Sequence, residues 1–145
     1  MHRYSFLFIM SFALLGCVSD TTGKAANDWI AKKEQCIEQE EQSQALFPRN
    51  EWFDSLTKQQ KIDVVLYIYN LKHQVCTEKE SLELERSLNN VGYKELGKHF
   101  TVLGAFDWPD ESALDGIDIE QVNKLSGQVG LFNLGTVGEQ LKFRE

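Results

Sequence analysis

Residues 58–75 read KQQKIDVVLYIYNLKHQV, and this stretch decides the fold. Apolar side chains lie on nearly every side of the helix that it would form, which is typical of a helix buried among others. Its β-branched residues also suit a strand, but the stretch is longer than ordinary strands are. Thr57 and Gln60 have the spacing of a capping box, which marks a helix start. The sequence therefore predicts a central helix over residues 58–75.

Helical patterns lie on both sides of this central stretch. Upstream, Asn27 is a candidate N-cap for a helix over residues 28–46. Its apolar residues recur at seven-residue spacing and so share one face: Trp29, Ile30, Cys36 and Ile37. Downstream, Thr77 is followed three residues later by a glutamate, as in a second capping box. We therefore expect the central helix to end near Thr77 and a short helix to follow over residues 78–90.

The last third of the chain has a different composition. Eight of the ten glycines follow Val91, and glycine weakens helices. Short helices are expected over residues 93–98, 118–126 and 136–143. Residues 100–106 and 129–134 are candidate strands for a minor hairpin near the C-terminus. The sequence thus predicts an all-α domain over residues 28–145, a bundle of about four or five helices, with an α+β fold as the alternative.

The N-terminus has the features of a targeting signal. Residues 4–15 hold no charge, and as a helix they span roughly 18 Å, too little for the ~30 Å core of a bilayer. The run ends in Leu14, Leu15, Gly16 and Cys17, which resembles the lipobox of bacterial lipoproteins. The resemblance implies a signal peptide over residues 1–16, cleavage after Gly16, and acyl chains such as palmitate on Cys17. Two or three such chains anchor a protein stably to a membrane.

The residues after Cys17 indicate which membrane the lipid would enter. In Gram-negative lipoproteins an aspartate directly after the cysteine retains the protein in the inner membrane. Here Val18 and Ser19 follow, so the resemblance implies the periplasmic face of the outer membrane. Residues 18–27 (VSDTTGKAAN) are small and polar, and we expect them to form a flexible tether between the lipid and the domain.

Cys36 and Cys76 remain once Cys17 carries lipid. An even pair of cysteines in an oxidising compartment predicts one disulfide, which would join the first helix to the junction after the central helix. Two buried free thiols are the alternative. Neither cysteine belongs to a C-x-x-C motif or to a histidine pattern, which argues against a catalytic thiol or a metal site.

Acidic residues dominate the charge of the chain, with 22 Asp and Glu against 15 Lys and Arg. Such a chain repels nucleic acid and anionic head groups, so the membrane is reached only through the lipid. The acids are densest around Trp108: Asp107, Asp110, Glu111, Asp115, Asp118 and Glu120. An EF-hand alignment on Gly116 lacks two required ligands, so we expect a solvated acidic loop and no metal.

Two apolar segments are candidate partner contacts. Phe106 and Trp108 lie beside Asp110 and Glu111 on one loop, where an exposed tryptophan would suit a binding surface. The alternative is that these aromatic side chains fold back onto a thin core. Residues 129–137 (VGLFNLGTV) carry no charge and form either part of the core or an apolar patch for a partner.

No pattern in the sequence predicts catalysis. His73 and His99 are the only histidines after the signal peptide, and neither has a His or Cys companion nearby. The glycines match no phosphate-binding loop, and no G-x-S-x-G is present. We therefore expect no catalytic residue, no cofactor and no metal ligand.

These observations favour a non-catalytic binding or assembly factor that meets a protein partner at the bacterial envelope. The expected architecture is similar to that of the secretion pilotins, which are small, mostly helical and disulfide-bonded. One alternative is a periplasmic immunity or inhibitor protein that covers a basic toxin or enzyme with its acidic surface. A second is a cell-wall enzyme that uses paired carboxylates.

Overall fold

The computed structural model describes residues 17–143, so the predicted signal peptide lies outside the described residues. This part of the chain forms six α-helices and one short 3₁₀ helix, and contains no strand. In chain order they are α1 (Cys17–Gln42), α2 (Glu51–Ser55), α3 (Lys58–Val91), α4 (Lys94–Val102), η1 (Glu111–Leu114), α5 (Ile119–Ser126) and α6 (Leu134–Gln140). The predicted all-α class is confirmed.

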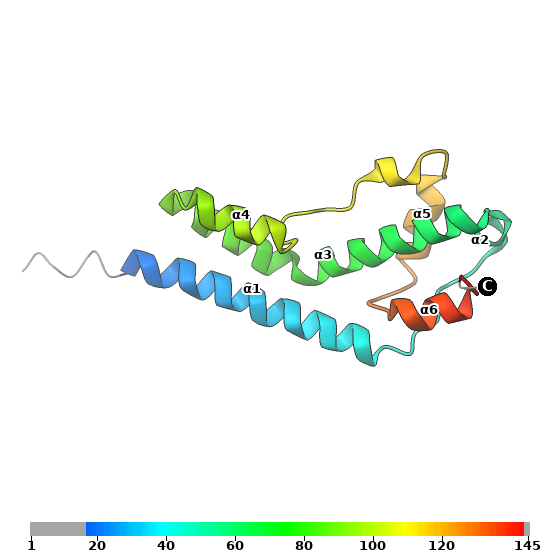
Figure 1. Cartoon of the computed structure of the whole chain (residues 1–145), viewed down its shortest axis with the longest axis horizontal. Coiled ribbons are helices and arrows are strands. Elements are labelled where there is room, and N and C mark those ends of the chain that lie inside the picture. Colours follow the sequence, from blue (N-terminus) through cyan, green and yellow to red (C-terminus); the bar gives the residue numbers. More distant parts are fainter. Residues whose placement is uncertain (1–16, 144–145) are drawn as a thin grey trace, which may run out of the picture.

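The two long helices, α1 and α3, form the frame of the molecule (Figure 1). They lie side by side where α1 begins and α3 ends, and they diverge toward the opposite end. Helix α4 covers the end of α3 near the start of α1, whereas α5 and α6 lie around the first half of α3. The fold therefore has one hydrophobic core at each end of the frame.

The larger core surrounds the first half of α3. Its buried residues come from α2, α3, the loops and the short C-terminal helices. The largest of those that are almost fully buried are Phe47, Phe53, Ile68, Leu125 and Phe132. The Phe132 ring lies between two other rings, 5.6 Å from the centroid of Phe47 and 5.8 Å from that of Tyr69. Of the two expectations for residues 129–137, burial in the core is therefore the one that holds for Val129, Phe132 and Val137.

The smaller core joins α1, the second half of α3 and α4. Trp29 is almost fully buried there with Leu84, Leu88 and Phe100. Its ring meets that of Phe100 edge to face at 5.4 Å, and its Nε1 donates to Ser81 Oγ at 3.0 Å. A buried indole N–H needs such a partner, and so this bond helps to fix α1 against α3.

The start of α1 differs from the prediction. The helix begins at Cys17 and not at Asn27, and residues 18–27 are helical where we expected a flexible tether. The reason is tertiary packing: Thr22 is buried and accepts a hydrogen bond from Ser87 Oγ at 2.7 Å, and Ala25 and Ala26 pack on the smaller core. The small residues that indicated a tether allow α1 to approach α3 closely.

Helix α3 confirms the first capping box and contradicts the second. At its start, Gln60 N donates to Thr57 Oγ1 at 3.3 Å and Thr57 N donates to Gln60 Oε1 at 3.1 Å. The helix then runs through Thr77 to Val91, so the expected break and separate helix over residues 78–90 are wrong. Thr77 Oγ1 instead donates to the carbonyl of His73 at 3.3 Å, so its hydroxyl bonds back into the preceding turn of α3 and does not cap a new helix.

The predicted C-terminal hairpin is also wrong. Residues 100–102 form the last turn of α4, and Gly104, at a φ of +79°, turns the chain away. Residues 129–133 are irregular, and Asn133 caps α6 by accepting from Thr136 N at 3.0 Å. Single buried side chains such as Phe132 anchor these segments, so they need no pairing between strands.

Candidate binding site

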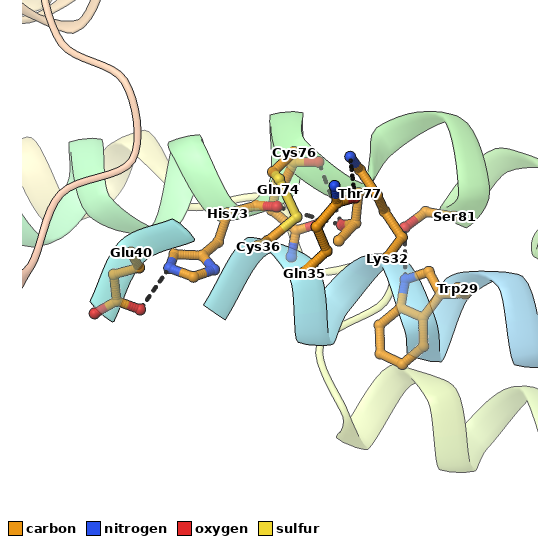
Figure 2. Close-up of a disulfide and its surroundings, with 10 residues drawn as sticks. All are labelled: Trp29, Lys32, Gln35, Cys36, Glu40, His73, Gln74, Cys76, Thr77 and Ser81. Atoms are coloured by element: carbon orange, nitrogen blue, oxygen red, sulfur yellow. Dashed lines mark hydrogen bonds and ion pairs between the residues drawn. A yellow bond between two sulfur atoms is a disulfide. The ribbon is translucent and has the colours of Figure 1, made fainter. Parts of the chain in front are cut away.

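The predicted disulfide is present and joins the last third of α1 to the middle of α3. Cys36 of α1 is bonded to Cys76 of α3, with their Cα atoms 6.3 Å apart. Trp29 and Ser81 lie to one side of the bridge, and Glu40 and His73 lie to the other (Figure 2). The bridge and its two flanking hydrogen bonds therefore fix how α1 is placed along α3.

A groove opens beside this interface and has a volume of about 520 Å³. Three parts of the chain line it: the second half of α1, the middle of α3, and the loop over residues 103–109. The α1 residues are Trp29, Lys33, Ile37 and Glu40, and the α3 residues are Tyr69, Asn70, His73, Gln74 and Thr77. The loop adds Leu103, Gly104, Asp107, Trp108 and Pro109.

The polar side of the groove is centred on the carboxylate of Glu40. Its Oε2 accepts from the hydroxyl of Tyr69 at 2.9 Å and lies 3.1 Å from Nε2 of His73. The side chains of Glu40 and His73 are only 14% and 21% exposed. Burial, and then the hydrogen bond to Glu40, raise the pKa of Tyr69 to about 12. The tyrosine hydroxyl therefore keeps its proton at neutral pH and remains a hydrogen-bond donor to Glu40.

The apolar side of the groove is exposed to solvent. Trp108 is 51% exposed, and Ile37 and Leu103 are also exposed. Hydrogen bonds hold the loop that carries Trp108: Gln74 Nε2 donates to the carbonyl of Gly104 at 2.7 Å, and Lys33 Nζ donates to that of Leu103. The exposed indole is therefore presented on a loop tied to both long helices.

The residues predicted to contact a partner do not all lie together. Trp108 lines the groove, whereas Phe106 packs half-buried against the smaller core. Asp110 and Glu111 are exposed outside the groove lining. Asp110 accepts from Ser112 N at 2.8 Å and so caps η1, and this bond lowers the pKa of its carboxyl. Asp110 of the acidic segment thus stabilises the start of η1, a role that we did not predict.

Sequence reasoning missed Glu40, Tyr69 and Asp107 as members of one site. Tyr69 and His73 are four residues apart on a helix, a spacing that places them on the same face. Their rings lie 4.7 Å apart. Glu40 comes from another helix, and no local pattern connects it with them.

Neither a metal cluster nor a membrane-spanning helix is found in residues 17–143. No group of three or more His, Cys, Asp or Glu side chains in this part of the chain is placed to hold a metal ion. No helix among the same residues is both long and apolar enough to cross a bilayer. Comparison of the chain with models of protein families, with curated proteins and with solved structures finds no match.

Proposed function

We propose that this chain is a lipid-anchored protein of the bacterial envelope that binds a protein partner through the groove and catalyses no reaction. One observation carries the proposal: an exposed tryptophan rims a groove whose walls are joined by a disulfide and by side-chain hydrogen bonds. Tryptophan is one of the residues enriched among binding hot spots. A rigid surface loses little entropy on binding, which favours affinity.

The disulfide supports the proposed location in the bacterial envelope. Disulfides persist in oxidising compartments such as the bacterial periplasm, and this one closes a loop of 40 residues. Because α1 begins at Cys17, a lipid on that residue would be followed by a helix and not by a loose tether. At ~1.5 Å per residue, Ile37 and Glu40 then lie roughly 30 to 35 Å along the helix from the lipid. The helix would act as a spacer between membrane and groove.

The address is tested by the mass of the protein purified from membranes. We expect a chain that starts at Cys17 and carries two or three acyl chains, and a further gain of two hydrogens on reduction. In the Cys17→Ala variant, the acyl mass should disappear and the protein should leave the membrane fraction. An unprocessed wild-type chain without acyl mass would refute the lipid anchor.

Partner binding is tested by photo-crosslinking in living cells. A photoreactive phenylalanine analogue placed at position 108 should give one discrete adduct with an envelope protein. The same analogue at Leu66, which is exposed on α3 outside the groove, should not give it. Equal adducts at the two positions, or none at position 108, would contradict a docking role for the groove. If the analogue placed at position 111 is the one that gives an adduct, and if high salt lowers the yield of that adduct, the inhibitor hypothesis is favoured.

A further inference from the structure

We propose that the partner segment bound in this groove inserts an arginine side chain, whose guanidinium pairs with Glu40 and lies against the aromatic rings of Tyr69 and Trp108. This inference rests on the proposed function, because it specifies what the groove recognises. Three observations lead to it: the charge left in the groove, the hydrogen bonding of Glu40, and the aromatic residues around it.

The side chains that line the groove carry more negative than positive charge. Glu40 and Asp107 supply two carboxylates, and Lys33 is the one lysine or arginine of the lining. Lys33 is already engaged, since its Nζ donates to the carbonyl of Leu103 and lies 5.0 Å from the centre of the Trp29 ring. His73 is engaged with Glu40 Oε2. The groove therefore complements a cation, as does the chain as a whole with its net charge of −7.

The bonding of Glu40 requires a donor from the partner. Both bonds from Tyr69 and His73 end on Oε2, and no described residue donates to Oε1. In the free protein, water can reach this partly exposed carboxylate. A partner that covers the groove removes that water, and a buried carboxylate oxygen without a donor is costly. The partner must therefore supply a donor at Oε1, and a cationic one gives the strongest bond.

The aromatic residues favour arginine over lysine. Tyr69 and Trp108 both line the groove, and cations are attracted to the faces of such rings. A guanidinium stacks on aromatic faces and is more weakly hydrated than an ammonium group, so its transfer into a half-buried groove costs less. Ile37 and Leu103 are exposed beside these residues and would contact apolar side chains that flank the arginine.

The inference is tested with two short peptides, acetyl-Gly-Leu-Arg-Leu-Gly amide and the same peptide with citrulline, which has nearly the shape of arginine but no charge. The whole protein, purified in detergent, is labelled with fluorotryptophan, which gives one signal for each of its three tryptophans. Trp29 and Trp108 line the groove and Trp52 does not. We expect the arginine peptide to shift the Trp108 signal and leave that of Trp52 unchanged. The citrulline peptide should bind about tenfold more weakly.

Two variants make the test specific. Glu40→Gln keeps the size of the side chain and can still accept from Tyr69, and it should abolish the preference for arginine. Glu41→Gln makes the same change of charge one residue further along α1, outside the groove, and should retain the preference. An unchanged thermal unfolding midpoint of each variant shows that its fold is retained.

The outcomes separate this inference from the proposed function. Equal affinity for the two peptides, or a Trp108 signal that the arginine peptide does not shift, would overturn the arginine inference. A crosslinked adduct at position 108 that persists undiminished in Glu40→Gln would do the same, while leaving a docking role for the groove intact. Absence of that adduct in the wild-type chain would overturn the proposed function itself.

Discussion

Removal of the disulfide by Cys36→Ala together with Cys76→Ala should lower the free energy of unfolding by about 4 kcal/mol. The bridge closes a loop of 40 residues, and in the chain-entropy model its loss restores that much conformational freedom to the unfolded chain. The expected loss is a large part of the stability of a small domain. Denaturation in urea, followed by helical circular dichroism, measures it.

Reduction provides the control for this prediction. A reductant should destabilise the wild-type protein by a similar amount and should leave the double variant unchanged. A loss below about 1 kcal/mol in both experiments would mean that the unfolded chain keeps α1 near α3 without the bridge. In that case the buried contacts of Trp29 and Glu40 would hold the two helices together.

The central helix could be predicted because its pattern is local in the sequence. The disulfide could be predicted because few cysteines were available to pair. Residues 58–75 are apolar on nearly all sides, and Thr57 and Gln60 mark where the helix starts. Only two cysteines remained after Cys17 was assigned to the lipid, so a single pairing was available. Neither inference required knowledge of the arrangement of the helices in space.

The errors arose where distant contacts decide the local structure. The sequence of residues 18–27 suits a tether, and its helix packs against α3 through Thr22, whose hydrogen-bond partner Ser87 is 65 residues away. Thr77 has the sequence of an N-cap, but packing on both sides of it continues the helix. Propensity is a weak guide in such cases, because tertiary contacts contribute more free energy.

To predict the groove, the geometry of a pair of packed helices has to be added to the predicted disulfide. In two antiparallel helices, a residue four positions after Cys36 lies opposite a residue three or four positions before Cys76. This rule places Glu40 beside His73, where the structure has it. The rule requires that both helices continue past the bridge, whereas we had predicted a break directly after Cys76. The error at Thr77 therefore also concealed the site.

The second large effect is expected for Phe132→Ala, which should lower the free energy of unfolding by about 3 to 5 kcal/mol. The ring is only 1% exposed and lies between Phe47 and Tyr69 in the larger core. Its removal leaves a cavity at a place where the chain is irregular and has no neighbouring strand to close the gap. Because Tyr69 also donates to Glu40, the cavity should loosen the polar side of the groove.

Val102→Ala is the matched control for Phe132→Ala, since Val102 is 87% exposed and its truncation should change stability by less than about 0.5 kcal/mol. Urea denaturation of both variants gives the comparison, and the arginine peptide should bind more weakly to Phe132→Ala than to Val102→Ala. A cost below about 1 kcal/mol at Phe132 would mean that residues 129–133 are not an anchor of the core. Burial of this uncharged segment would then contribute little to the free energy of unfolding, and the rest of the larger core would hold the C-terminal helices in place.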